Sequence, residues 1–82
     1  MIKVLFFAQI RDQLGTSELQ VPSNENTDVM TLLANLQSRD KHWLTVLSKG
    51  KLMVAINQTM STQNVRLKEG DEVAFFPPVT GG

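Results

Sequence analysis

The residues best suited to chemistry are the last two of the chain, Gly81 and Gly82. Glycine has no Cβ, so its backbone can enter a narrow channel and take φ angles closed to other residues. A carboxylate on such an arm can be carried into the active site of another protein, and six extended residues reach roughly 20 Å. We therefore predict a folded domain over residues 1–76 and a flexible tail over residues 77–82. A frayed chain end is the alternative interpretation.

The composition excludes several classes of function. The eight basic and eight acidic residues give a net charge of zero. The basic residues are scattered, so nothing predicts the concentrated positive charge that nucleic acids require. The chain of 82 residues has no cysteine, which excludes a disulfide framework, a cysteine nucleophile and a thiolate zinc site. No apolar run approaches a membrane span, and the apolar start is too short for a signal peptide. We expect one cytoplasmic domain that does not contact a membrane.

The strand pattern predicts one sheet. Alternating or β-branched runs predict strands at residues 2–8, 17–21, 51–56 and 72–76, with a short return strand at 59–60. Turns are predicted at residues 57–58 and 68–71. The first and last strands are the most apolar, so we expect them to be central neighbours. A parallel pairing between them requires a crossover, which the helical segment between them supplies.

The helical pattern predicts helices that pack on one face of that sheet. Thr27 is the expected N-cap of the main helix, with Asp28 in its first turn. Its apolar stripe has the spacing i, i+3, i+4 and i+7 and consists of Val29, Leu32, Leu33 and Leu36. A short second helix is expected to carry Trp43, Leu44 and Leu47 and to stop at Gly50. A helical turn is also expected at residues 9–14. Together these elements predict a two-layer α+β domain.

The other face of the sheet is more apolar than a solvated face should be. Lys3 marks it as the face turned away from the helices. It nevertheless carries a set of apolar side chains: Leu5, Phe7, Met53, Met60, Ala74 and Phe76. A contiguous apolar patch marks a partner site. Either a partner docks here, or the short second helix or a loop covers the patch.

The remaining polar residues form no convergent catalytic set. The single histidine, His42, has no second ligand nearby, so we predict a surface position and no metal site. Asp71 and Glu72 are neighbours on a strand and point to opposite faces, so we interpret them as part of a solvated turn. Arg11 and Asp12 are candidates for contacts at the rim of a partner site. Trp43 is expected in the core, between helix and sheet.

Three segments of the sequence resemble a known family. They are residues 2–9, residues 55–58 and above all residues 70–82, with the sequence GDEVAFFPPVTGG. These segments resemble the ubiquitin-like β-grasp sulfur carriers, among them the small subunits of molybdopterin synthase. The resemblance implies a mixed sheet of four to five strands, covered on one face by one main helix plus a short helix.

The resemblance also implies how the tail would act. An E1-like enzyme would use ATP to convert the Gly82 carboxylate into an acyl-adenylate, and a sulfur donor would replace AMP to leave a thiocarboxylate. The sulfur would pass to cyclic pyranopterin monophosphate in the large synthase subunit and form the molybdopterin dithiolene. Two small and two large subunits would make up the complex.

In that scheme each candidate residue has a role. Gly82 is the reactive residue. The tail is positioned by Gly81, Thr80, Val79 and Pro78, and the partner is bound by Phe7, Met60 and Phe76. The chain would have no complete active site of its own, no metal and no permanently bound cofactor.

Two alternatives share parts of this scheme. A sulfur carrier for thiazole and thiamine synthesis or for tRNA thiolation would use the same tail with another acceptor. A thiamine requirement after loss of the gene would favour it. A non-covalent ubiquitin-like docking module would need no free carboxylate, so it would tolerate an extra residue after Gly82.

Overall fold

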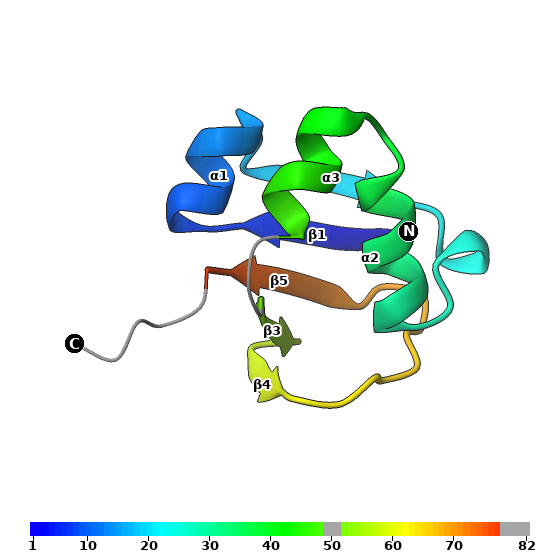
Figure 1. Ribbon diagram of the computed structural model, residues 1–82. Coiled ribbons are helices and arrows are strands. Elements are labelled where there is room, and N and C mark those ends of the chain that lie inside the picture. The colour runs from blue at the N-terminus through cyan, green and yellow to red at the C-terminus, as the bar shows by residue number, and fades with distance from the viewer. Residues whose placement is uncertain (49–51, 78–82) are drawn as a thin grey trace.

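The molecule has two layers, a five-stranded mixed sheet and three α-helices (Figure 1). This computed structural model describes residues 1–48 and 52–77. The strands are β1 (Ile2–Phe6), β2 (Glu18–Val21), β3 (Met53–Ile56), β4 (Thr59–Ser61) and β5 (Glu72–Phe76). The helices are α1 (Ala8–Leu14), α2 (Val29–Gln37), α3 (Lys41–Leu47) and the 3-10 turn η1 (Ser23–Glu25). The predicted α+β class is confirmed, although the turn expected at residues 9–14 is a full helix, α1.

The two most apolar strands lie side by side in the middle of the sheet, as predicted (Figure 1). The strand order is β2-β1-β5-β3-β4, and β1 runs parallel to β5 with Val4 opposite Val73. The pairs β1–β2, β3–β4 and β3–β5 are antiparallel. The parallel pair is buried on its helix face, because Ile2, Val4 and Val73 have no exposed surface.

Aromatic packing joins the helix layer to the sheet. The Phe6 ring meets the Trp43 ring edge-on, with 5.5 Å between centroids, and stacks on Phe75 at 6.0 Å. Trp43 is therefore in the core, as predicted. The inward side chains of α3 are Trp43, Val46 and Leu47, whereas Leu44, which belongs to the same predicted apolar pattern, is 49% exposed. The predicted stop of this helix at Gly50 lies outside the described residues.

The main helix begins one residue later than predicted. The Oδ1 atom of Asp28 accepts a hydrogen bond of 2.7 Å from the Thr31 N–H, so Asp28 is the N-cap of α2. The carbonyl of Thr27 accepts from the Leu67 N–H at 2.8 Å, which holds Thr27 in a pairing with a distant segment. The bonds from Thr31 are also the main reason why the pKa of Asp28 lies below its usual range.

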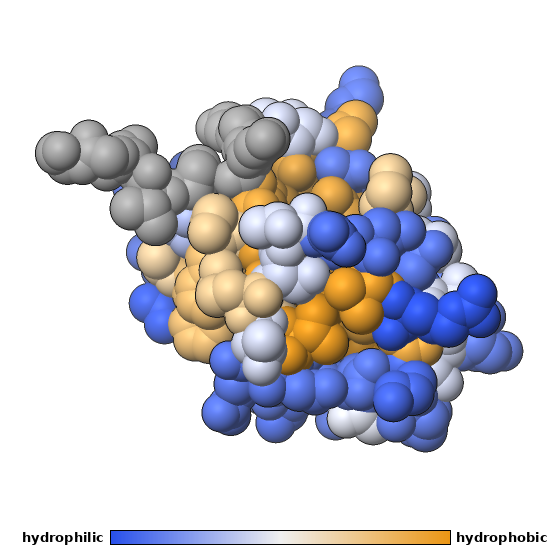
Figure 2. Space-filling model, turned by 90° about the horizontal axis from the view of Figure 1, so that it is seen from below, coloured by the Kyte–Doolittle hydropathy of each residue, from blue (hydrophilic) through white to orange (hydrophobic). Residues whose placement is uncertain are grey.

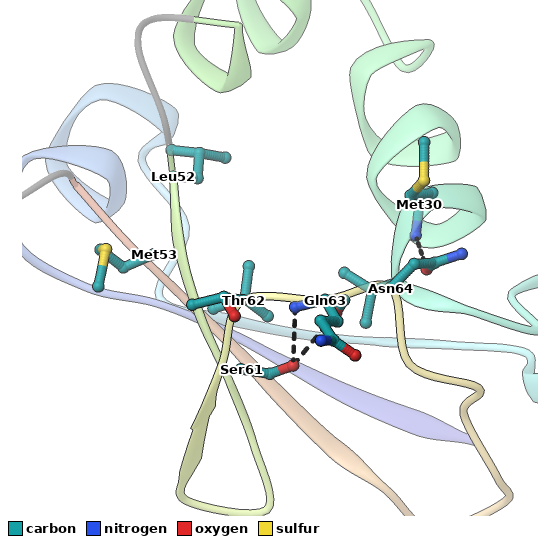
Figure 3. Close-up of a pocket in the computed structure, with 9 residues that line it drawn as sticks. Met30, Leu52, Met53, Ser61, Thr62, Gln63 and Asn64 are labelled. Atoms are coloured by element: carbon teal, nitrogen blue, oxygen red, sulfur yellow. Dashed lines mark hydrogen bonds between the residues drawn. The ribbon is translucent and has the colours of Figure 1, made fainter.

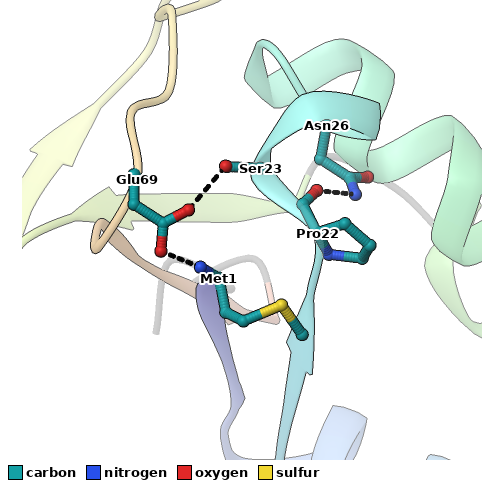
Figure 4. Close-up of polar contacts among 5 residues, drawn as sticks. All are labelled: Met1, Pro22, Ser23, Asn26 and Glu69. Atoms are coloured by element: carbon teal, nitrogen blue, oxygen red, sulfur yellow. Dashed lines mark hydrogen bonds and ion pairs between the residues drawn. The ribbon is translucent and has the colours of Figure 1, made fainter.

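Glu69 joins three segments at the end of the sheet where β1 begins, opposite the end at which Phe7 and Phe76 lie. Its Oε1 atom accepts from the Ser23 hydroxyl at 2.7 Å, and Oε2 contacts the amino group of Met1 (Figure 4). The contact with that amino group is the first cause of a lowered pKa at Glu69. Nearby, the side chain of Asn26, which is 3% exposed, donates to the Pro22 carbonyl at 2.8 Å. These bonds fix η1 against the turn before β5.

Asp71 is buried, which corrects its interpretation as part of a solvated turn. Its Oδ2 atom accepts from the Lys68 N–H at 2.8 Å, and Oδ1 accepts from the Asn57 side-chain amide at 3.1 Å. The Oδ1 atom of Asn57 in turn accepts from the Glu72 N–H at 3.0 Å. The carboxylate therefore links the β3–β4 turn to the start of β5.

Acid is expected to weaken the fold through Asp71. The Lys68 N–H is the main cause that holds the pKa of Asp71 below its ordinary value of 3.8. The unfolded chain therefore binds a proton at a pH at which the folded chain does not. This contribution to stability is present above the unfolded pKa and is lost as the pH falls through the lower, folded pKa.

The variant Asp71→Asn tests this contribution. It is expected to lower the free energy of unfolding by roughly 1 kcal/mol at neutral pH, because two bonds to a charged acceptor are weakened. Its stability should also fall less steeply than the wild type in acid. Urea denaturation across the acid range measures both effects. Asp12→Asn, at a side chain that is 73% exposed, is the matched control and should change neither. Equal acid sensitivity in both variants would contradict the role of Asp71.

In the part of the chain that the structure describes, no helix has the length and apolar character needed to cross a bilayer.

Candidate functional site

The sheet face opposite the helices carries an apolar hollow of about 410 Å³. Its lining comes from β1, β3, β4, β5 and the adjoining turns, and consists of Leu5, Phe7, Ala55, Gln58, Met60, Glu72, Ala74 and Phe76. Five of the six apolar residues predicted for the open face line this hollow. The sixth, Met53, is the neighbour of Phe76 across the β3–β5 pair. None of the described helices covers the hollow, because all three pack their buried residues on the other face.

Two phenylalanines form the edge of the hollow nearest Pro77. The rings of Phe7 and Phe76 stack with centroids 4.8 Å apart and an interplanar angle of 6°. The parallel pairing of β1 and β5 explains their position. Phe7 directly follows β1 and Phe76 is the last residue of β5, so both lie at the same end of the two strands. Phe7 remains 37% exposed. The sequence prediction that these two residues belong to one exposed face is confirmed.

The backbone beside Phe7 is strained. Ala8 has a φ of +54°, which turns the chain sharply from β1 into α1. Such a left-handed conformation costs a non-glycine residue roughly 1–2 kcal/mol. The strand predicted to run to Ala8 therefore ends at Phe6. Phe7 keeps the open-face position that alternation along β1 gives it, because the neighbouring Phe6 is the buried residue.

A tight hairpin places Met60 on the opposite side of the hollow. Asn57 and Gln58 have φ angles of +48° and +69°, the pattern of a two-residue hairpin turn of type I′. The predicted turn at residues 57–58 is thus confirmed. Met60 lies opposite Ala55 in the β3–β4 pair and is 53% exposed. The small side chains of Ala55 and Ala74, which are 5% and 6% exposed, form the floor.

The far end of the open face is polar. Lys3 lies next to Glu72 in the β1–β5 pair, and its Nζ atom is 3.9 Å from an oxygen of Glu18 on β2. The face therefore changes from aromatic at the tail end to charged at the other. An apolar area bordered by charged side chains is a composition found at protein interfaces.

The other candidate residues lie away from this face. His42 contacts the carbonyl of Gln13 through its Nε2 atom and so bridges α3 to α1 at an exposed position. Arg11 and Asp12 form an exposed ion pair of 3.6 Å on α1, and their predicted role at a partner's rim stays a prediction. Within residues 1–48 and 52–77, no three acidic, histidine or cysteine residues are grouped in a way that could hold a metal ion.

Comparison with known proteins decides the family. The ThiS family matches residues 4–82. The chain belongs to the ThiS family. It is also 48% identical over 82 residues to the molybdopterin synthase sulfur carrier subunit of Escherichia coli, with 100% of both chains covered. The subunit of the same name from Haemophilus influenzae is 45% identical over 82 residues, again with 100% of both chains covered.

Solved structures resemble this ThiS-family chain over nearly its whole length. One is the complex of subunits 1 and 2 of molybdopterin-converting factor from Helicobacter pylori, with a TM-score of 0.70, 28% identity, and 99% and 97% of the two chains covered. SAMP1 from Haloferax volcanii has a TM-score of 0.78 at 23% identity, with 99% and 98% covered, which supports the fold alone. The predicted ubiquitin-like β-grasp fold and the predicted family are both confirmed.

The residues predicted to carry and position sulfur in this ThiS-family chain are not described by the structure. These are Pro78, Val79, Thr80, Gly81 and Gly82. The last described residue, Pro77, directly follows Phe76 at the edge of the hollow. The roles of these five residues and the predicted flexibility of the tail therefore stay predictions.

A second hollow, of about 380 Å³, was not predicted. It lies between α2 and the β3–β4 edge and is lined by Val29, Met30, Leu52, Met53, Val54, Ser61, Thr62, Gln63 and Asn64 (Figure 3). Asn64 Oδ1 accepts a bond of 2.9 Å from the Met30 N–H across it. Figure 3 shows Leu52 turned toward α2, whereas Met53 points to the other side of β3. Seen from the β4 side, hydrophobic surface fills the middle of the molecule within a frame of hydrophilic side chains (Figure 2). No local signal predicts this hollow, because its lining comes from three separate segments.

Proposed function

We propose that this chain is the sulfur carrier subunit of molybdopterin synthase, with the Gly82 carboxylate as the group that carries sulfur. The observation that carries the proposal is the apolar hollow beside the stacked pair of Phe7 and Phe76, from whose edge the tail sequence continues. The full-length similarity to subunits of that name supports the same function.

The chemistry begins with activation of the tail. A carboxylate is a poor electrophile because its leaving group would be oxide. An E1-like enzyme transfers AMP from ATP to the Gly82 carboxylate and releases pyrophosphate. Hydrosulfide from a sulfur donor then attacks the acyl carbon, the bond to AMP breaks, and a thiocarboxylate remains. The chain itself holds no cofactor in this cycle, and ATP belongs to the activating enzyme.

The second half of the cycle takes place in the large subunit. The open face docks while the loaded tail enters that subunit's active site and gives its sulfur to cyclic pyranopterin monophosphate. The Helicobacter pylori complex, which contains subunits 1 and 2 of molybdopterin-converting factor, supports a large-subunit partner. Two small and two large subunits form the proposed assembly, and the cytoplasm, where ATP is available, is its proposed location.

The roles of the tail residues follow from their types. Gly81 gives clearance in a narrow channel. Thr80, Val79 and Pro78 seat the tail through backbone bonds and small pockets. General acids and bases come from the partner, because the open face brings together no such set.

Intact mass measurement tests the proposal. The chain is mixed with its activating enzyme, ATP and a sulfur source, and its mass is compared with that of the untreated chain. We expect one oxygen to be replaced by sulfur, and fragmentation should place the sulfur at Gly82. Adding the large subunit and cyclic pyranopterin monophosphate should return the mass to that of the carboxylate form.

Two results would contradict the proposal in different ways. An unchanged mass with a demonstrably active activating enzyme would favour a docking module without covalent chemistry. Loading with sulfur that this large subunit cannot discharge would favour a carrier for another acceptor.

A further inference from the structure

We propose that Met60 is an oxidation site that controls docking: hydrogen peroxide converts its thioether into a sulfoxide, and the sulfoxide prevents a partner from occupying the apolar hollow. The inference rests on the proposed function, because it takes the hollow as the docking site of the large subunit. It adds a chemical switch on the carrier itself, separate from the chemistry of the tail.

Exposure makes Met60 accessible in the free chain. Its surface is 53% exposed, and it lies on the short edge strand β4, which pairs only with β3 among the described strands. Peroxide can therefore reach the sulfur without unfolding the domain. Oxidation of methionine depends on this access.

Docking would place the same side chain in an apolar environment. Met60 lines one side of the hollow, and the aromatic pair of Phe7 and Phe76 lines the other. The floor between them is alanine. The lining of the hollow therefore contains few hydrogen-bond donors for a buried sulfoxide oxygen. The side-chain amide of Gln58, at the rim, is one of them.

The oxidation step is balanced with peroxide alone. The sulfur lone pair attacks one peroxide oxygen and the O–O bond breaks. The sulfur loses two electrons and gains the oxygen, while the other oxygen leaves as hydroxide and takes up a proton to form water. The product is polar and chiral where the thioether was apolar and flexible.

The expected effect on docking is large. A buried polar group without a partner carries a substantial desolvation penalty, which corresponds to a loss of affinity of about tenfold or more. The relation is reciprocal, so a docked partner should protect Met60 from peroxide.

The chain contains its own comparison sites. Met1 and Met30 are 50% and 67% exposed, so peroxide should reach them as readily. Neither lines the hollow on the open face, because Met30 lies on α2 beside the second hollow and Met1 precedes β1 at the opposite end from the tail (Figures 3 and 4). Oxidation of these two residues should leave docking unchanged.

The experiment uses the full chain in its carboxylate form and the large subunit of molybdopterin synthase. The wild type, Met60→Leu and Met30→Leu are each treated with peroxide, which is then removed with catalase. Peptide mass measurement gives the oxidised fraction at every methionine, and calorimetry gives the affinity for the untreated large subunit. Met60 belongs to the proposed docking face, so the affinity of each variant before treatment serves as the reference for its affinity after treatment.

We expect peroxide to weaken binding at least about tenfold in the wild type and in Met30→Leu. Peroxide should leave the affinity of Met60→Leu almost equal to the untreated value of the same variant. Treatment with the two methionine sulfoxide reductases should restore the wild type, which separates the sulfoxide from irreversible damage.

Three results would overturn the inference. Met60 could resist peroxide while Met30 is oxidised, the wild type could keep its affinity with Met60 fully oxidised, or Met60→Leu could lose as much affinity as the wild type. If the untreated wild type does not bind the large subunit, the proposed docking function fails first and this inference fails with it.

Discussion

Adding one alanine after Gly82 is expected to abolish sulfur transfer and to leave the fold unchanged. The extra residue moves the carboxylate by roughly 3.3 Å and adds a Cβ where the proposed path requires glycine. The side chains of the described core belong to residues 2–75, so we expect the fold not to depend on the extension. Single-turnover formation of molybdopterin from the extended chain, the activating enzyme and the large subunit measures the effect.

Two controls identify the cause of that loss. The melting temperature of the extended chain and its affinity for the large subunit should stay within error of the wild type, because the hollow is intact. A version with a cleavable extension should regain activity once the exact Gly82 end is restored. Full activity of the uncleaved chain would contradict the proposed carboxylate chemistry and favour the non-covalent docking module.

Phe76→Arg is expected to weaken docking of the large subunit by at least about 2 kcal/mol, the size of an interface hot spot, or roughly 30-fold in affinity. Phe76 stacks on Phe7 at 4.8 Å and lies at the root of the tail, so its replacement removes an aromatic contact and brings a charge into an apolar hollow. The side chain is only half-buried in the free chain, so the fold should tolerate the change. Calorimetric titration with the large subunit measures the affinity.

Met30→Arg is the matched control for this prediction. It also places an arginine at an exposed apolar residue, but on α2, away from the open face. Its affinity for the large subunit should equal that of the wild type. Equal losses in the two variants would indicate a general effect of charge, and no loss in Phe76→Arg would remove the docking role of the open face.

The arrangement of the strands could be predicted from the sequence wherever the apolar pattern of a strand determines its place in the sheet. The strong apolar character of the first and last strands predicts that they are central neighbours, and β1 and β5 pair in parallel. The period of two along each strand separates Val73 from Ala74 and so predicts two faces with different partners. The open face is predictable for the same reason, since Phe7 and Phe76 cannot be buried under helices that cover the other side.

The predictions are wrong at residues whose position depends on a contact with a distant segment of the chain. Thr27 and Asp28 are both good N-cap residues, and the bond from the Leu67 N–H to Thr27 determines which of them caps α2. The role of Asp71 depends on Asn57, which lies in the β3–β4 turn, fourteen residues earlier in the chain. The left-handed Ala8 breaks a local preference, so no propensity could place the end of β1. In each case the deciding contact is tertiary.

The candidate site has two parts, the described hollow and the tail residues that follow Pro77 in the sequence. Its docking half, with Phe7, Met60 and Phe76, could be predicted because alternation along strands is a short-range rule, and the structure brings the three residues to one hollow. Its proposed reactive half, residues 78–82, lies outside the described residues. The Gly-Gly end alone predicts a carboxylate on a narrow arm, whereas its proposed thiocarboxylate chemistry could be predicted only through the family resemblance.

The pairing of β1 with β5 also connects docking to the order in which the chain is made. Phe7 is synthesised early and Phe76 late, yet the hollow needs both, so it cannot form on a nascent chain before residue 76 has left the ribosome. Contacts between such distant segments form slowly, because a long loop must close first. A partner that recognises the stacked pair therefore distinguishes the folded domain from an incomplete or unfolded chain.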